Sequence, residues 1–204
     1  MNAAEIALVV VAGLLLIAVV LVTAARRLDR LHRRENSSRA TLEVQLVHRA
    51  EAAIALAESG LLDPAGAIVV ADAGWRAAFG AERLVGEDDH SATGPSHAAG
   101  SARGLAESEL SRALRTALGT PEDQGPLAAT PDGAAHLRTL AHHVYRVQLA
   151  RRFHNDAVVQ IRHVRRTWAV RLFRLAGRAP MPRPFEMDDE VDVLDPGPDA
   201  TPLG

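Results

Sequence analysis

Residues 137–175 read LRTLAHHVYRVQLARRFHNDAVVQIRHVRRTWAVRLFRL, and this stretch decides the fold class. Apolar side chains recur in it at steps of three or four residues, which is the spacing of one face of an α-helix. The stripe consists of Leu137, Leu140, Val144, Val147, Ala150, Phe153, Ala157, Ile161, Val164, Trp168, Leu172 and Leu175. A stripe of this length is typical of a helix that packs along other helices in a bundle or coiled coil. Gly177 and Pro180 are expected to end it.

The segments that precede this helix also carry helical patterns. Residues 28–59 contain a second apolar stripe, whose members are Leu42, Leu46, Ala50, Ala53 and Leu56. Residues 36–38 (Asn-Ser-Ser) can break or cap a helix, so the pattern leaves the continuity of this helix open. Further helices are predicted over residues 65–79, where a strand is the alternative for 67–71, and over residues 105–118.

Three other segments lack an apolar stripe. Residues 86–104 are small, polar and glycine-rich, so a flexible loop is predicted there. Residues 120–136 contain several prolines and are predicted to form a second loop. Residues 178–204 are rich in proline and acid, which predicts a disordered tail. The predicted fold class is therefore all-α, built from long helices that share one core.

An apolar run lies near the start of the chain. Ile6–Ala25 reads IALVVVAGLLLIAVVLVTAA and contains no charged residue. As a helix it is about 30 Å long, which matches the hydrocarbon core of a bilayer. Basic side chains follow it directly, at Arg26, Arg27, Arg30, Arg33 and Arg34, whereas residues 1–5 carry none. The positive-inside rule therefore predicts a single-pass helix in a bacterial-type cell membrane, with residues 1–5 outside and a cytoplasmic domain at 26–177.

A cleavable signal peptide is the alternative for this run, because Val22-Thr23-Ala24 resembles a cleavage site. The run lacks a basic n-region, however, and it is longer than the apolar part of a typical signal peptide. We therefore predict an uncleaved transmembrane helix whose five flanking arginines face anionic lipid headgroups.

Composition limits the chemistry that is available to the chain. The absence of cysteine excludes disulfides, thiolate zinc sites and a cysteine nucleophile. All 23 basic residues are arginine, which a GC-rich genome explains more simply than selection for anion binding. The net charge of −2 argues against binding to nucleic acid through bulk charge. The arginine-rich face from Arg146 to Arg178 leaves open a contact with anionic lipid or another polyanion.

The sequence contains none of the common catalytic, phosphate-binding or metalloprotease motifs, so no catalytic, cofactor-binding or metal-binding residue is predicted. His142 and His143 are adjacent and point about 100° apart on a helix, so they cannot chelate one ion as a pair. Arg152 and Asp156 are four residues apart and share one helix face. They are interpreted as polar contacts between helices, with Phe153 in the core, and the alternative is a polar groove that holds a ligand or partner.

Residues 150–158 read ARRFHNDAV and resemble the ARRFYNDAV signature of the LemA family, with His154 in place of the usual tyrosine. Further similar strings follow in the family's order: LEVQL at 42–46, AESELSRAL at 106–114, LFRLAG at 172–177 and PRPFE at 182–186. The resemblance extends from the apolar run to Glu186 and marks a divergent member. It implies an N-out, single-pass protein whose cytoplasmic part is an antiparallel bundle of long helices, and it supplies no catalytic activity.

The sequence as a whole predicts a membrane-anchored helical interaction or scaffold protein without catalysis. The candidate interaction residues are those of the signature string, Arg151, Arg152, Phe153, His154, Asn155 and Asp156. A protein partner and anionic lipid headgroups are the expected contacts, whereas neither a cofactor nor nucleic acid is expected. Two alternatives stay open. One is an accessory or weak hydrolytic enzyme with a polar groove near Arg152, His154 and Asp156, and the other is a module that binds anionic lipid or another polyanion through its arginine-rich face.

Overall fold

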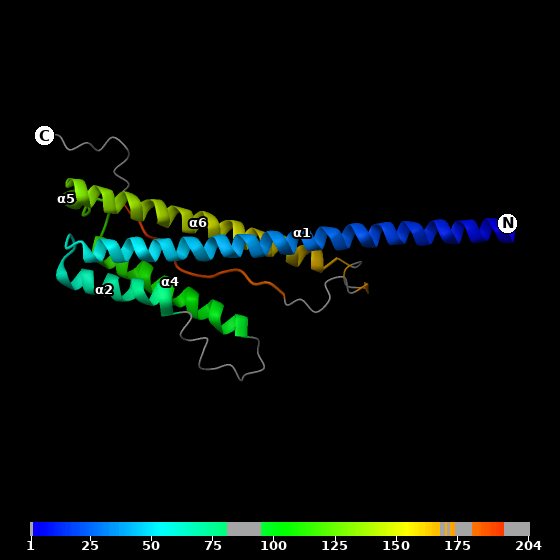
Figure 1. Cartoon of the computed structure of the whole chain (residues 1–204), viewed down its shortest axis with the longest axis horizontal. Coiled ribbons are helices and arrows are strands. Elements are labelled where there is room, and N and C mark those ends of the chain that lie inside the picture. Colours follow the sequence, from blue (N-terminus) through cyan, green and yellow to red (C-terminus); the bar gives the residue numbers. More distant parts are fainter. Residues whose placement is uncertain (1, 81–94, 168–169, 171, 174–180, 194–204) are drawn as a thin grey trace. The chain divides into compact units, whose positions relative to one another are not determined.

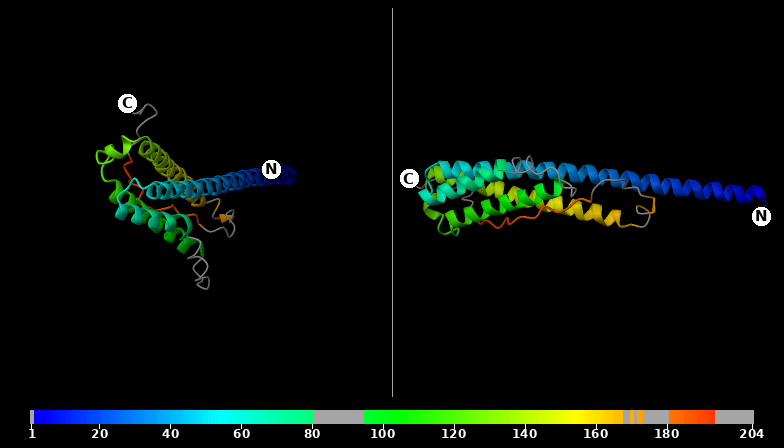
Figure 2. Two further views of the ribbon diagram at one scale, coloured as in Figure 1. Left: turned by 60° about the vertical axis from the view of Figure 1, so that its left-hand side comes forward. Right: turned by 90° about the horizontal axis from the view of Figure 1, so that it is seen from below.

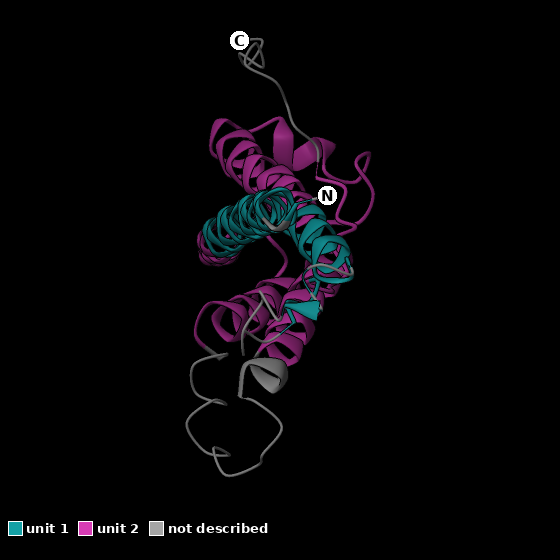
Figure 3. Ribbon diagram, turned by 90° about the vertical axis from the view of Figure 1, so that its right-hand side faces the viewer, with its two compact units in different colours: residues 1–39, 154–184 teal, residues 40–153, 185–204 magenta. Residues whose placement is uncertain are grey.

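The computed structural model describes residues 2–80, 95–167, 170, 172–173 and 181–193, and its regular elements in these residues are all helical (Figure 1). The elements are α1 (Ala3–Glu58), α2 (Pro64–Trp75), the π-helix η1 (Arg76–Gly80), α4 (Pro95–Leu118), α5 (Gly125–Ala128) and α6 (Pro131–Arg165). The prediction of an all-α fold class is confirmed for the part of the chain that the structure describes. The chain divides into two compact units, residues 1–39 with 154–184 and residues 40–153 with 185–204, which Figure 3 colours separately.

The first unit contains the N-terminal part of α1 and the C-terminal part of α6. The apolar stretch of α1 has a mean hydropathy of 3.2 and is 0% buried, so it is long and apolar enough to cross a membrane. That criterion rests on length and composition alone, and a signal sequence also meets it. Beyond this stretch, Leu28 and Leu31 pack with Val164 and Val170 in a small apolar cluster.

The first helix is continuous, and the break that the sequence left open at residues 36–38 does not occur. Within this helix the hydroxyl of Ser38 donates a hydrogen bond to the carbonyl oxygen of Glu35, at 2.8 Å. The side chain therefore satisfies its own polar group without leaving the helix.

The second unit holds the main apolar core, to which α1, α2, α4 and α6 all contribute. The fully buried core residues include Ala50, Ala53 and Leu56 of α1, Val70 and Ala77 of the α2–η1 region, Leu110 and Leu114 of α4, and Leu137 and Leu140 of α6. A smaller cluster joins Leu42 and Leu46 of α1 to Val147 and Ala150 of α6. All members of the stripe predicted within residues 28–59 are therefore buried, as expected.

The helix predicted over residues 65–79 is confirmed, and the strand alternative for 67–71 is not realised. It begins after Asp63, whose carboxylate accepts hydrogen bonds from the backbone N–H groups of Ala65 and Gly66, each at 3.0 Å. Gly74 lets α2 approach α1 closely, because a Cβ at that position would lie 2.7 Å from Cγ1 of Ile54.

Several predicted boundaries are wrong. The loop expected at 86–104 overlaps α4, which already begins at Pro95, and residues 86–94 lie outside the described residues. The loop expected at 120–136 contains α5, and α6 begins at Pro131 because Thr130 caps it by accepting a hydrogen bond from the N–H of Gly133 at 3.1 Å. The last helix ends at Arg165, and the stop predicted at Gly177 and Pro180 lies outside the described residues.

The long stripe of the last helix is largely confirmed, since its members from Leu137 to Ala150 and at Ala157, Ile161 and Val164 are buried. Phe153 is an error in the prediction, because its side chain is 54% exposed. His154 is buried in its place, at 4% exposure, and the step from Ala150 to 154 and then to Ala157 fits helical spacing equally well. Leu172 is also exposed, and Trp168 and Leu175 lie outside the described residues.

Candidate functional site

The most elaborate polar arrangement in the second unit surrounds residues 185–193, FEMDDEVDV, which we call the strap. The strap follows a non-helical path beside α4 (Figures 1 and 2). Its burial alternates with a period of two, as in an extended chain. The less exposed, inward positions are Phe185, Met187, Asp189, Val191 and Val193, and the exposed, outward positions are Glu186, Asp188, Glu190 and Asp192. The prediction of a disordered tail at 178–204 is therefore wrong for these nine residues.

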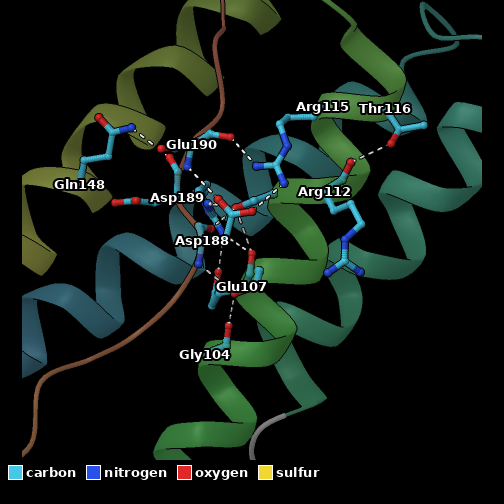
Figure 4. A network of polar contacts seen from close by, with 12 residues as sticks. Gly104, Glu107, Arg112, Arg115, Thr116, Gln148, Asp188, Asp189 and Glu190 are labelled. Carbon is cyan, nitrogen blue, oxygen red and sulfur yellow. Dashed lines mark hydrogen bonds and ion pairs between the residues drawn. The ribbon is translucent and has the colours of Figure 1, made fainter.

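One face of α4 binds the middle of the strap (Figure 4). The backbone N–H of Asp188 donates to the hydroxyl of Ser108 at 2.9 Å, and the hydroxyl of Ser111 donates to the carbonyl oxygen of Asp188 at 2.6 Å. Arg115 forms an ion pair with the carboxylate of Asp188 at 2.6 Å and also donates to the carbonyl oxygen of Glu190. These three side chains share a face because they are spaced by three and four residues.

The α6 helix binds the strap from a second direction. Gln148 donates to the carbonyl oxygen of Asp189 at 3.0 Å. Arg151 donates to the carbonyl oxygen of Met187 at 3.2 Å and forms an ion pair with the Asp189 carboxylate at 2.9 Å. The side chains of Arg151 and Asp189 are 29% and 14% exposed, so this pair is better shielded from water than the pair between Arg115 and Asp188.

Apolar contacts fix the two ends of the strap. Val191 is buried, at 6% exposure, and belongs to the main core cluster, against which Val193 also packs. Phe185 and Met187 pack on the smaller cluster of Leu42, Leu46, Val147 and Ala150. The buried amide of Gln124 donates to the carbonyl oxygen of Asp192 at 2.9 Å. We call the side chains that hold the strap the cradle. Its members are Ser108, Ser111 and Arg115 of α4, Gln148 and Arg151 of α6, and Gln124.

A buried ion pair lies directly beneath the cradle. Arg49 of α1 and Glu107 of α4 are joined at 2.8 Å, and neither side chain is exposed. Arg103 holds the other oxygen of Glu107 at 2.9 Å. Burial lowers the pKa of Arg49 and raises the pKa of Glu107, because both charged forms lose contact with water. The two guanidinium groups oppose this effect on Glu107, since each favours the carboxylate.

Ser111 connects this buried pair to the strap. Its oxygen accepts a hydrogen bond from Arg49 at 3.0 Å, and its hydroxyl donates to the carbonyl oxygen of Asp188. Asp189 also stabilises the charged form of Arg49 electrostatically. The helices contribute four arginines to this network but one acid, Glu107. The strap adds the carboxylates of Asp188 and Asp189. The four arginines are Arg49, Arg103, Arg115 and Arg151. The strap therefore compensates positive charge that the helices themselves leave in excess.

The signature residues are not gathered at one site. Arg151 belongs to the cradle, whereas Arg152 and Asp156 are exposed and Asn155 is half-buried. The buried ring of His154 lies beside the first helix, with Nδ1 3.5 Å from the hydroxyl oxygen of Ser38. Arg151 therefore makes its polar contacts with the strap, whereas His154 makes its polar contact with α1.

The arginines that follow the apolar stretch of α1 are exposed, as a lipid-facing role requires: Arg26, Arg27, Arg30, Arg33 and Arg34. Arg33 also pairs with Asp29 one turn earlier, at 2.7 Å. Neither residue of this pair is shielded from solvent, so it contributes little to stability.

Three histidines of the second unit lie close together. The ring of His143 is 5.2 Å from that of His142 and 5.4 Å from that of His48, measured between centroids. Partial burial, followed by the neighbouring His142, His48 and Arg146, lowers the pKa of His143. Within the described residues, no group of three His, Cys, Asp or Glu side chains could hold a metal ion.

Sequence reasoning missed the strap and the buried ion pair, although both leave a signal. The strap alternates F-x-M-x-D-x-V-x-V, which is the pattern of an extended chain with one buried face. Arg49 and Glu107 interrupt apolar helical faces, and a charge at such a position indicates a buried partner. Comparisons with protein-family models, with curated proteins and with solved structures found no match to the chain.

Proposed function

We propose that this protein is a membrane-anchored helical interaction module, similar to the LemA family, that acts by binding another protein and not by catalysis. The observation that carries the proposal is the strap, a peptide held along α4 and α6 chiefly through its main chain. Side chains that converge on the main chain of an extended peptide are typical of a peptide-binding surface. The chemistry of the site is therefore recognition.

The anchor in this proposal is the stretch Ile6–Ala25, which lies within the helix that is apolar enough to cross a membrane. The exposed arginines after it support an orientation with residues 1–5 outside and the remainder in the cytoplasm, where these arginines contact anionic lipid headgroups. The resemblance to LemA supports the same orientation and an antiparallel arrangement of the long helices. A protease added to sealed spheroplasts should leave the bulk of the chain intact, and cleavage of the bulk would contradict this topology.

The alternatives receive less support. A hydrolytic groove near Arg152, His154 and Asp156 needs an accessible histidine, and the ring of His154 is buried. A polyanion-binding face on α6 needs free arginines, yet three of them already make internal contacts. Arg146 donates to Gln45 at 3.2 Å, Arg151 binds the strap, and Arg162 donates to the carbonyl oxygen of Pro182 at 2.9 Å.

Site-specific photo-crosslinking in native membranes tests the interaction proposal. A crosslinker replaces Arg112, an exposed residue on α4 near the strap, or Thr139, an exposed residue of α6 that serves as the control. The comparison uses the full chain and a variant that ends at Pro184. We expect a protein crosslink at position 112 that increases without the strap and disappears with Arg151→Glu. Equal crosslinking at both positions, or none from position 112, would contradict the proposal.

A further inference from the structure

We propose that the cradle binds, in trans, an extended acidic peptide of a partner protein, and that the strap is a competitor that occupies the same site in cis. This inference rests on the proposed function and names the class of partner. The peptide would carry apolar side chains at alternating positions and an aspartate at the central inward position, as the strap does at Asp189.

The main-chain contacts show why a foreign peptide can bind. Five carbonyl oxygens of the strap accept hydrogen bonds from side chains of the cradle, those of Met187, Asp188, Asp189, Glu190 and Asp192. The N–H of Asp188 donates to Ser108. Every peptide offers these groups in the same repeat, so these contacts of the cradle are made to the main chain and are open to a foreign peptide. Of the outward positions, Asp188 pairs with Arg115 at a solvent-exposed site, and the side chains of Glu186, Glu190 and Asp192 are exposed.

The inward positions supply the selectivity. Asp189 pairs with Arg151 in a partly shielded site, so replacing the acid would leave the guanidinium without its partner. Val191 is buried in the main core, which favours an aliphatic residue two positions after the aspartate. Phe185 and Met187 pack on the smaller cluster and fix the register at the other end. A partner segment is therefore selected by side chains at every second position.

Gly104 provides an independent sign that the helix surface accommodates a main chain. A Cβ at this position would lie 2.2 Å from the carbonyl oxygen of Glu186, which is closer than real contacts allow. At Gly100, one turn earlier on the same helix, an added Cβ would meet nothing within 4 Å. The absence of a side chain at 104 thus leaves room for peptide backbone at the point where the strap passes α4.

Charge indicates that the partner segment is acidic. Without the strap, Arg115 and Arg151 lose their carboxylates, and the buried Arg49 and the half-buried Arg103 have only Glu107 as an acid partner in this network. The emptied cradle would attract an anion. A lipid headgroup, a phosphate or a nucleic acid would satisfy the arginines. It would not satisfy the side-chain amides of Gln148 and Gln124, which donate to main-chain carbonyl oxygens, or fill the buried position of Val191. A peptide satisfies all of these groups, so we commit to a peptide.

Covalent attachment gives the strap an advantage over a partner. A tethered segment has an effective concentration of about a millimolar, so a peptide in trans must be abundant, tighter or multivalent to displace it. The pair of Arg115 with Asp188 is more than a third exposed on both sides, so it opposes release only weakly. The strap therefore restricts the cradle to partners that bind better than it does.

The test measures fluorescence anisotropy of a labelled FEMDDEVDV peptide with the whole protein in nanodiscs of phosphatidylcholine. Three forms are compared: the full chain, a variant that ends at Pro184, and a full-length Asp189→Arg/Val191→Asp variant that weakens the strap without truncation. Circular dichroism verifies that each form is helical. We expect binding to the second and third forms that is about tenfold or more tighter than to the full chain. Equal binding to all three forms would overturn competition in cis.

Peptide variants identify what is recognised. Asp189→Asn within the peptide should weaken binding by about tenfold or more, because it removes the shielded ion pair. Asp192→Asn, at an exposed outward position, should leave binding unchanged within about twofold, as expected for an exposed charge. A scrambled peptide of the same composition should bind at least about tenfold more weakly, since the inward register is lost. Equal binding of the scrambled peptide, or displacement by inorganic phosphate or phosphatidylglycerol vesicles at similar charge, would identify a general anion site and overturn the inference.

The two proposals fail in different ways. If FEMDDEVDV does not bind the strap-less forms while position 112 still crosslinks a membrane protein in an Arg151-dependent manner, the peptide inference falls and the interaction module stands. If the peptide binds as expected and no such crosslink forms in native membranes, the cradle is a peptide site for the strap alone and the proposed function falls.

Discussion

Arg49 and Glu107 form an ion pair at 2.8 Å in which neither side chain is exposed to solvent. The pair joins α1 to α4 inside the second unit, and Arg103 binds the remaining carboxylate oxygen from the rim. A buried pair of this kind gains little over a well-packed apolar pair, but the loss of one partner is costly because the other charge stays buried.

Glu107→Gln should therefore destabilise the protein strongly. The change leaves the buried Arg49 charge without its carboxylate, and we expect a loss of about 3–5 kcal/mol in the free energy of unfolding. Denaturant unfolding of the detergent-solubilised chain, followed by far-ultraviolet circular dichroism, measures it. The double variant Arg49→Met/Glu107→Leu should recover most of the loss. A double variant as unstable as Glu107→Gln would show that the pair itself stabilises the fold.

Gly104→Ala should release the strap, because the added Cβ clashes with the main chain of Glu186. Gly100→Ala is the matched control, since it makes the same substitution in the same helix where space is open. Hydrogen exchange of residues 185–193 should become fast in the first variant and stay slow in the second. Both substitutions favour the helix by up to about 1 kcal/mol, so unequal exchange reports the clash and not helix propensity. If the amides of residues 185–193 were equally protected from hydrogen exchange in the two variants, the strap would not pass over Gly104.

Arg151→Ala and Arg152→Ala separate the cradle from the rest of the signature string. Both remove one positive charge from adjacent positions of α6, but Arg151 contacts Met187 and Asp189 whereas Arg152 is exposed. We expect limited proteolysis after residue 184 to accelerate only in Arg151→Ala, consistent with a loss of about 1–3 kcal/mol of local stability. Similar acceleration in both variants would indicate an effect of general charge.

The stability of the second unit should fall as the pH drops below about 6.5, the ordinary pKa of histidine. Partial burial, followed by the neighbouring His142, His48 and Arg146, lowers the pKa of His143 in the folded state, although Glu51 opposes them. The unfolded chain then binds the proton more readily, so folding stability is fully present above about 6.5 and is lost as protons are added. His143→Gln should flatten the melting temperature between about pH 7 and pH 5, measured by thermal denaturation. His163→Gln, at an exposed position, should leave the slope unchanged.

The sequence predicted those features that depend on a repeated local pattern. The spacing of Leu42, Leu46 and Ala50 matches the helical turn and predicts a buried helix face. All three side chains are buried in the structure. Phe153 and His154 mark the limit of this reasoning. Both positions continue the stripe, and size and hydrophobicity favoured the phenylalanine, whereas the structure buries the histidine beside Ser38.

The strap was missed for a different reason. Its composition is that of a disordered tail, and a segment with so many acids cannot form a core of its own. Asp188, Asp189 and Val191 become ordered through partners that are distant in sequence, namely Arg115, Arg151 and the main core. No local pattern reports such long-range contacts, although the alternation along the strap shows which of its sides is buried.

The alternation of the strap also determines the sign of the charge that this part of the protein surface exposes to solvent. While it is bound, Asp188 and Asp189 pair with Arg115 and Arg151, and the exposed Glu186, Glu190 and Asp192 add further negative charge to this surface. Detachment uncovers the guanidinium groups, so the same patch of surface changes from repelling anions to attracting them. A single movement of nine residues thus inverts the polarity of the protein's exterior at this place, and retention on an ion-exchange resin would report which state the molecule occupies.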